Sequence, residues 1–114
     1  MNITWHGQSC FRLTERGLAT VVTDPYDHKV VGYHELDLSA DIITVSHDDP
    51  GHNHVSAVRK RKSEQHILTG PGEYEIGEVF VTGIRTNHKT KNDQLRNVMY
   101  IFDYQGILVA HLGN

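Results

Sequence analysis

The 114-residue sequence contains a single cysteine, one tryptophan and only three prolines. A lone cysteine, Cys10, cannot form an intrachain disulfide, which is typical of a protein from a reducing compartment, so we expect a cytoplasmic location. Cys10 stands between Ser9 and Phe11 in a strand-like run. We therefore predict that it is a small buried apolar residue and not a nucleophile.

Long apolar segments and an excess of one charge are also absent. No stretch approaches the roughly 20 apolar residues of a membrane-spanning helix, and the N-terminus has no signal-peptide core. The formal net charge is −3 at pH 7, which does not favour a polyanionic partner. The one basic run, from Arg59 to Lys62, suits the C-terminal end of a helix. We expect a small-molecule substrate of unidentified class, and neither nucleic acid nor membrane as a partner.

Most of the sequence has the patterns of β-strands. We predict one domain, residues 1–114, of the α+β class and rich in β-structure, with a mixed or antiparallel sheet and one short helix at residues 55–62. The expected strands are residues 3–5, 9–13, 19–23, 41–45, 65–68, 73–76, 79–86, 98–104 and 107–110.

Three of these segments, 41–45, 98–102 and 107–110, are apolar on successive residues. That pattern is typical of a strand covered on both faces. Because the chain has little helix with which to cover a sheet, we expect that it is cut short and lacks a second sheet. The exposed apolar face would then be buried in a homodimer, or against a complementary C-terminal half.

One loop concentrates residues that bind metals. Between Thr44 and His54, an apolar run ends in three histidines and two aspartates, interrupted by a Pro-Gly turn. A strand that delivers imidazoles and carboxylates to a tight loop supplies the ligands that zinc prefers. On spacing alone, a solvated histidine-rich turn without metal is an equal alternative.

Five motifs follow one another along the chain: WHGQSCF at 5–11, VTDP at 22–25, SADIITVSH at 39–47, GPGEYEIG at 70–77 and HLG at 111–113. In this order they resemble the metallo-β-lactamase-fold hydrolases, and most closely the branch of ascorbate-6-phosphate lactonases and other predicted zinc-dependent hydrolases. The resemblance extends along the whole chain. It covers only the N-terminal half of the αββα sandwich of that family, and it implies a dinuclear zinc site.

The metal motif of that family is His-x-His-x-Asp-His. His47 and His52 match its first and last histidines, whereas Asp49 replaces the middle histidine and Gly51 replaces the aspartate. Glycine has no side chain, so the resemblance implies that the second metal position is lost.

Two further positions of the family pattern lie later in the chain. His88 matches a family histidine, and Asn114 replaces the bridging aspartate of His-Leu-Gly-Asp. The resemblance thus implies one zinc ion or none. The predicted ligands are His47, Asp49, His88 and His52, with His54 and Asn114 as alternatives and with Asp24 orienting a ligand histidine from behind it or capping a strand end.

The predicted function is that of a metal-dependent hydrolase-like protein with a degenerate site, weak or inactive alone. A bound metal would lower the pKa of a water to near 7, but with Asp49 as a ligand no general base is evident. A non-catalytic β-sheet module that self-assembles or pairs with a missing half is the alternative. Two histidines and a carboxylate also suit an iron- or oxygen-using protein. Glu73 and Glu75, on a hairpin with alternating faces, do not suit a glycosidase.

Overall fold

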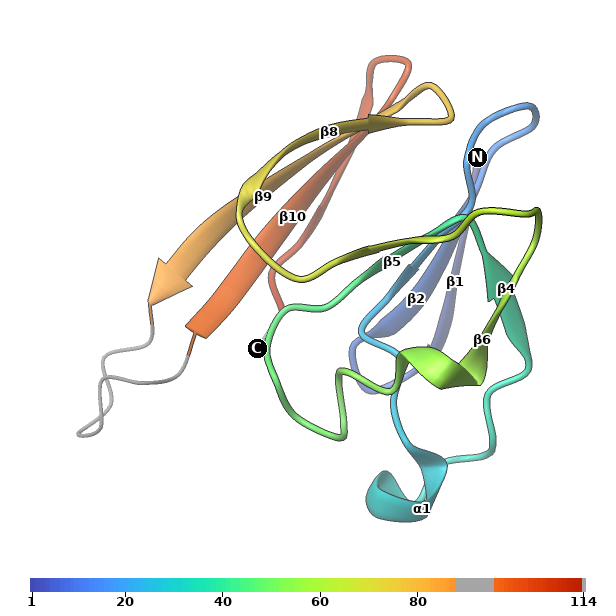
Figure 1. Cartoon of the computed structure of the whole chain (residues 1–114), viewed down its shortest axis with the longest axis vertical. Coiled ribbons are helices and arrows are strands. Elements are labelled where there is room, and N and C mark those ends of the chain that lie inside the picture. The colour runs from blue at the N-terminus through green and yellow to red at the C-terminus, as the bar shows by residue number, and fades with distance from the viewer. Residues whose placement is uncertain (88–95, 114) are drawn as a thin grey trace.

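Figure 1 shows the computed structural model of the chain, in which residues 1–87 and 96–113 are described. The first of its sheets has five strands in the order β1–β2–β3–β5–β7. Antiparallel pairs join β1, β2 and β3, whereas β3, β5 and β7 are parallel. The strands of this first sheet are β1 (Asn2–Gly7), β2 (Cys10–Thr14), β3 (Val21–Thr23), β5 (Ile42–Thr44) and β7 (His66–Leu68).

The second sheet is an antiparallel meander of four strands in the order β11–β10–β9–β8. Short strands β4 (Leu38–Ala40) and β6 (Val58–Lys60) form a separate parallel pair. The second sheet consists of β8 (Gly72–Ile76), β9 (Val79–Asn87), β10 (Arg96–Tyr104) and β11 (Ile107–His111).

The main core lies between the two sheets, which stand opposite one another in Figure 1. Ile42 of the first sheet is fully buried in the same cluster as Phe102 of the second. Two tyrosines of β10 also place their hydroxyl groups in this layer. Tyr100 Oη donates to the Leu68 carbonyl at 3.0 Å, and Tyr104 Oη donates to the Ala19 carbonyl at 2.8 Å. The buried hydroxyls are therefore satisfied by backbone groups of the facing sheet.

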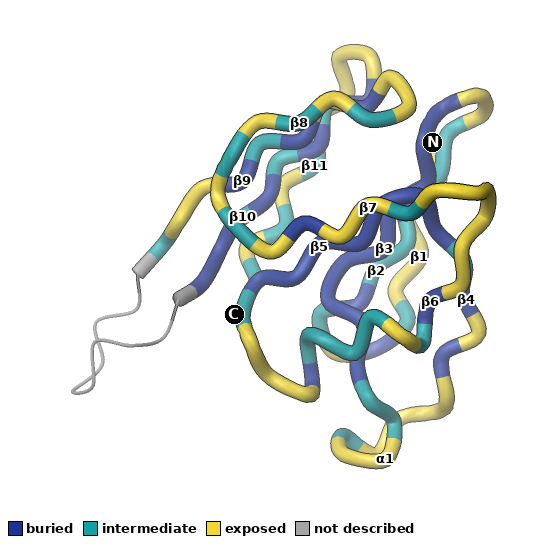
Figure 2. The backbone as a smooth tube through the Cα atoms, in the orientation of Figure 1, coloured by how far each residue is buried: buried dark blue, intermediate teal, exposed yellow. Residues whose placement is uncertain are grey.

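A second core covers the opposite face of the first sheet, where the β4–β6 pair and its loops pack. Ile43 of β5 belongs to this cluster, together with Tyr26 and Val58. Because side chains alternate along a strand, Ile42 and Ile43 enter different cores and both have no exposed surface. The prediction that this strand is covered on both faces is confirmed (Figure 2).

The expectation that the chain lacks a second sheet was wrong. Strands β8 to β11 are themselves that sheet, and they pack against the first one. In β10, Tyr100 and Phe102 are buried while Ile101 between them is half-buried, so the strand is fully covered on one face only. β11 is an edge strand, and its Leu108 is 66% exposed. Both strands also carry apolar residues on their outer face, and for this reason the sequence pattern wrongly predicted that they are covered on both faces.

The helix was also placed wrongly. The segment from Val55 to Ala57 is a single 3₁₀ turn, and β6 follows it directly. Pairing of β6 with β4 and burial of Val58 override whatever helical preference the segment has. The one α-helix described, α1 (His28–Val31), lies in the preceding polar loop. The side chain of Asp27 caps its N-terminus.

The predicted class, α+β and rich in β-structure with mixed and antiparallel sheets, is confirmed. Cys10 is buried, as predicted, and burial raises the pKa of its thiol to about 12. At neutral pH the thiol is therefore protonated and a poor nucleophile. Among the described residues, no helix has both the length and the apolar character needed to cross a membrane.

Packing between the sheets predicts a clear difference between two isoleucines. Replacing Ile42 by alanine should lower the free energy of unfolding by about 2–5 kcal/mol, because it opens a cavity between the sheets. Ile84 of β9 is 40% exposed on the outer face, so Ile84→Ala should cost clearly less. Urea unfolding followed by circular dichroism measures both. Equal losses would mean that the two sheets do not share a core.

Candidate metal centre

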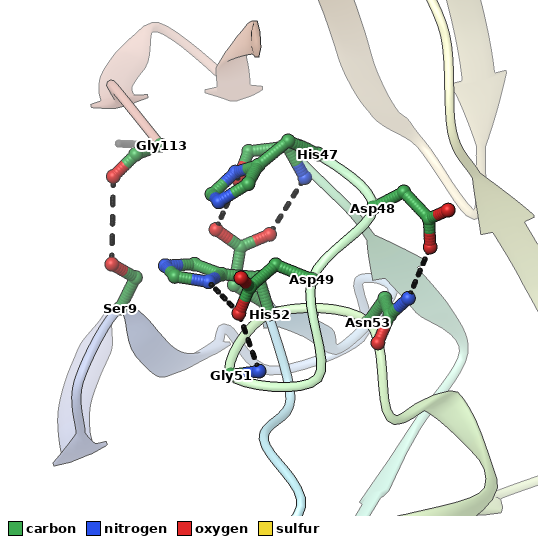
Figure 3. A network of polar contacts seen from close by, with 10 residues as sticks. Ser9, His47, Asp48, Asp49, Gly51, His52, Asn53 and Gly113 are labelled. Carbon is green, nitrogen blue, oxygen red and sulfur yellow. Dashed lines mark hydrogen bonds and ion pairs between the residues drawn. The ribbon is translucent and has the colours of Figure 1, made fainter. Parts of the chain in front are cut away.

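The candidate site lies where parallel strands of the first sheet end. β3 and β5 pair in parallel, so their carboxyl ends reach the same edge of the sheet. Asp24 directly follows β3, and Ser46 and His47 follow β5. The Asp24 amide donates to the Thr44 carbonyl at 2.8 Å and keeps the two strand ends together. Figure 3 shows the side chains that meet at this edge.

Asp24 has no exposed surface, and its backbone has a φ of +40°. Positive φ is uncommon outside glycine, and Asp and Asn accept it more readily than most residues. Both carboxylate oxygens receive a hydrogen bond from Ser46. The Ser46 amide donates to Oδ1 at 2.7 Å and the Ser46 hydroxyl donates to Oδ2 at 2.6 Å.

Ser46 also fixes the imidazole of His47. Its Oγ lies 2.8 Å from His47 Nδ1. Because the single hydroxyl proton is donated to Asp24, the oxygen accepts a hydrogen bond from Nδ1–H. The lone pair of the imidazole is then on Nε2, the atom left to bind a metal. A carboxylate that acts behind a ligand histidine is a common arrangement in metal sites.

His52 returns to the same place through a tight turn. Its amide donates to the Asp49 carbonyl at 2.7 Å, and its ring centroid lies 4.0 Å from that of His47. Asp49 Oδ1 accepts a hydrogen bond from the Gly51 amide at 2.7 Å and lies 3.4 Å from His52 Nδ1. The turn therefore brings two histidines five residues apart in sequence into ring contact.

Asp24, His47 and His52 form a group in which one ligand atom from each residue lies within 4.8 Å of the others. Two imidazoles and a carboxylate are a common donor set for zinc and for non-haem iron. Burial raises the pKa of the Asp24 carboxyl, although the Ser46 hydrogen bonds oppose the rise, and burial lowers the pKa of His47. A neutral imidazole beside a desolvated carboxylate suits a bound cation.

The structure brings together only part of the predicted ligand set. His47 and His52 are in the group, and Asp24, expected behind a histidine or at a strand end, reaches His47 through Ser46 and also stands among the candidate ligands. Asp49 lies next to His52, and its role as a ligand stays a prediction. His54 instead lines a cleft beside Tyr26 and Ser56. His88 and Asn114 lie outside the described residues.

Sequence reasoning missed Ser46, and it gave His111 no role beyond its place in the HLG motif. His111 Nε2 lies 2.9 Å from the Ser9 carbonyl, while its buried Nδ1 has no hydrogen-bond partner among the described residues. Gly113, with φ +77°, packs so closely that a Cβ there would lie 2.6 Å from Ser46 Cβ. The signal present in the sequence was position, because Asp24-Pro25 directly follows the buried strand β3 and Ser46-His47 begins two residues after the end of the buried strand β5.

A cleft of about 490 Å³ opens on one side of His47. Its walls are largely apolar and include Val45 and Val98, whereas Arg85 and Thr69 are among its polar residues. Such a concave, mostly apolar surface with a few polar groups is typical of small-molecule sites.

Comparisons with known proteins identify the family to which this fold is similar. Residues 2–114 match the family model of the β-lactamase superfamily domain. The crystal structure of a predicted Zn-dependent hydrolase of the metallo-β-lactamase superfamily from Thermotoga maritima superposes with a TM-score of 0.73 at 32% identity. The match covers 97% of this chain and 48% of the other, so the chain spans about half the length of that protein.

A more distant structure shows the fold alone. CmlA, a diiron β-hydroxylase from Streptomyces venezuelae, matches with a TM-score of 0.63 at 9% identity, over 96% of this chain and 28% of that one. No curated protein matches the chain.

The raised pKa of Asp24 predicts how an asparagine would behave there. The ionised carboxyl is disfavoured in the folded state, so Asp24 lowers stability at pH 7 and not below pH ~4, where it is protonated in both states. Asp24→Asn, which also tolerates the positive φ, should therefore raise the free energy of unfolding of metal-free protein at pH 7, and this gain should disappear at pH 4.

Urea unfolding in the presence of a chelator, at both pH values, measures this difference. The exposed Asp48 provides the control, because Asp48→Asn should change stability little at either pH. A loss of stability in Asp24→Asn at pH 7 would mean that the Ser46 hydrogen bonds outweigh the burial of the charge.

Proposed function

Because the chain belongs to the β-lactamase superfamily, we propose that it is a metal-binding, hydrolase-like member of it whose ion is held by Asp24, His47 and His52. The observation that carries this proposal is the convergence of two imidazoles and a buried carboxylate within 4.8 Å. The chain itself positions two of the three donors, since the Ser46 hydroxyl binds both Asp24 and His47. Preorganised ligands lower the entropic cost of binding.

Zinc is the ion we propose. His, His and carboxylate with one open position is a common zinc set in hydrolases, and the 32% identical relative is itself named as a predicted Zn-dependent hydrolase. Iron accepts the same donors. The diiron relative, at 9% identity, shares the fold and supports no choice of metal.

Zinc at this site would supply the acidity that turns a bound water into a nucleophile near pH 7. The part of this chain is to keep His47 in one tautomer and to present the cleft beside it to a substrate. A strong general base is not evident. The Gly51 amide holds the pKa of the exposed Asp49 carboxyl below its usual range, which makes that carboxylate a weak base. We therefore expect slow hydrolysis of esters, lactones or phosphoesters, or none.

The second candidate is a non-catalytic β-sheet module. The buried, reduced Cys10 suits a cytoplasmic location for either function. The two functions differ in metal content. The hydrolase-like function requires one zinc-binding site, which can be measured by adding zinc to protein that was purified without it. The β-sheet module requires no such site.

Zinc titration by calorimetry tests the ligand set. One zinc ion should bind, and His47→Ala, His52→Ala and Asp24→Ala should each lower the affinity tenfold or more, on the order of 1.4 kcal/mol, because each removes a donor. His66 is exposed and pairs only loosely with Glu64 at 3.8 Å, so His66→Ala should leave the affinity unchanged.

Two further variants distinguish this set from the one predicted from sequence. If Asp24→Ala binds zinc normally while Asp49→Ala or His88→Ala does not, the metal has the ligands that sequence indicated. If none of the five variants changes the affinity, the protein has no zinc site on this loop.

Restoring the family motif should strengthen binding. The triple variant Asp49→His, Gly51→Asp and Asn114→Asp supplies the three residues of the family motif that this chain lacks. A Cβ at residue 51 would lie 3.0 Å from Asp49 Oδ1, an atom that the variant removes. We expect tighter zinc binding with little turnover on a panel of phosphodiesters and lactones. Robust turnover by the unmodified chain would contradict a degenerate site.

A further inference from the structure

The cleft beside His47 takes its walls from both sheets, on the side of the sandwich where β7 connects to β8. Val45, which follows β5, and Val98 of β10 are among its apolar residues. Thr69 and Pro71 belong to the connection between β7 and β8. Among the described residues that line the cleft, none comes from β1 or β11, the edge strands on the other side. The cleft is therefore separate from those two edges.

Arg85 of β9 reaches this cleft from the second sheet. It stands opposite Val98 in the antiparallel pair of β9 and β10, and residues that face each other across a ladder share one face of the sheet. Val98 belongs to the core between the sheets, so Arg85 extends from the same inner face. The residue is exposed and lines the cleft, so a solute that enters the cleft can reach it.

The backbone of β9 places Arg85 where the cleft opens. Gly83 precedes it by two residues on the same face, and a Cβ at Gly83 would lie 2.9 Å from the Gly70 carbonyl oxygen. At that point β9 and the connection between β7 and β8 are in close contact. The next inward position along the strand is occupied by Arg85, and there the cleft separates the two sheets.

Hydrogen bonds connect the arginine end of the cleft to its histidine end. The Val98 amide donates to the Ser46 carbonyl at 2.8 Å, and Ser46 directly precedes His47. Facing residues of antiparallel strands have Cα atoms about 4.5–5.5 Å apart, so Arg85 lies one such step from Val98. A small molecule in the cleft is therefore long enough to contact both Arg85 and His47.

The charges around the cleft favour an anion at the arginine. Among the described residues that line it, Arg85 is the only lysine or arginine. Asp48 is the one carboxylate there, and its Oδ1 accepts a hydrogen bond from Asn53 Nδ2 (Figure 3). Because the other walls are largely apolar, a guanidinium beside them attracts an anion more strongly than one surrounded by water. Its planar set of N–H donors matches the oxygens of a carboxylate or a phosphate.

We propose that the cleft binds a small substrate that carries a negatively charged group, a carboxylate or a phosphate, apart from the bond that is cleaved. Arg85 binds the charged group, Val45 and Val98 contact the apolar part of the molecule, and the reacting bond lies beside His47. Arg85 then determines specificity for charged substrates. The part of this proposal that concerns hydrolysis rests on the proposed function, whereas binding of the anion needs no metal.

A purely structural arginine is the alternative. The aliphatic part of an arginine side chain can cover apolar surface such as that of Val98. That role predicts that substitution of Arg85 lowers stability without changing the preference of the cleft between charged and neutral ligands.

A matched pair of ligands distinguishes the two roles. Phenylpropionate and its neutral amide, phenylpropanamide, share an apolar body and differ in charge. Each is titrated into isotope-labelled protein from which metal and chelator have been dialysed, because a bound metal would itself attract the carboxylate. Nuclear magnetic resonance should show shift changes at residues of the cleft, with an affinity for phenylpropionate about tenfold or more above that for the amide. A third titration, with phenyl phosphate, identifies which charged group is preferred, and either preference supports the proposal.

Three variants locate the charge that is responsible. Arg85→Gln removes the charge and should abolish the preference for phenylpropionate while leaving the affinity for the amide unchanged. Arg85→Lys keeps the charge without the planar set of donors and should retain part of the preference. Arg59→Gln makes the same change at an exposed arginine of a different cleft and should have no effect. Circular dichroism checks that the variants are folded.

Equal affinities of the unmodified chain for the two ligands overturn the proposal, and so does a preference that persists in Arg85→Gln. If Arg85→Gln does not fold, the preference of the unmodified chain and its decrease with added salt decide the question. The zinc titration remains a separate test. A chain that prefers phenylpropionate but binds no zinc contradicts only the proposed function, and a chain that binds zinc without that preference contradicts only the anion site.

Discussion

The pair of hydrogen bonds from Ser46 to the buried carboxylate of Asp24 joins the fold to the site. A carboxylate with no exposed surface needs donors, and here one residue supplies both, at 2.7 and 2.6 Å. Ser46 lies just beyond the end of the neighbouring strand β5, so the bonds close the sheet edge between β3 and β5. The Ser46 hydroxyl then sets the tautomer of His47. His47 therefore presents Nε2 as its free ring nitrogen because Ser46 and Asp24 meet where β5 and β3 end.

The second sheet forms hydrogen bonds with the edge of the first sheet where β3 and β5 end. The Val98 amide at the start of the buried part of β10 donates to the Ser46 carbonyl at 2.8 Å. Asn97 Nδ2 donates to the Leu112 carbonyl at 2.8 Å, and this bond holds the C-terminal loop against the site. Gly113 is needed there because its φ is positive and Asn97 Oδ1 occupies the space of a Cβ. The site is therefore assembled from β3, β5, β10 and the segment after β11, which are far apart in the sequence.

Local patterns in the sequence predicted the strands well, and they predicted that the strand at residues 41–45 is covered on both faces. They failed where coverage depends on distant segments. Met99 and Ile101 are apolar on the outer face of β10, so the strand reads like β5 although it is fully buried on one side only. The helix expected at residues 55–62 does not form, because residues 58–60 pair as β6 with β4. No local sequence pattern predicts that pairing. His47 and His52 were identifiable because a turn brings them together within one loop. Asp24 lies among the candidate ligands because β3 and β5 pair in parallel and in a particular register. That register could not be predicted from the sequence.

The replaced motif positions have consequences that follow from this geometry. With glycine at residue 51, the turn uses its amide to hold Asp49, so the carboxylate that stands in the place of a family histidine is engaged by the backbone and exposed. The buried Asp24 is the carboxylate that forms a group with both imidazoles. Burial raises its pKa, which means that the ionised form is disfavoured until a cation neutralises it. A buried carboxylate of this kind gains more from a bound cation than an exposed carboxylate does, because the cation offsets a charge that burial disfavours.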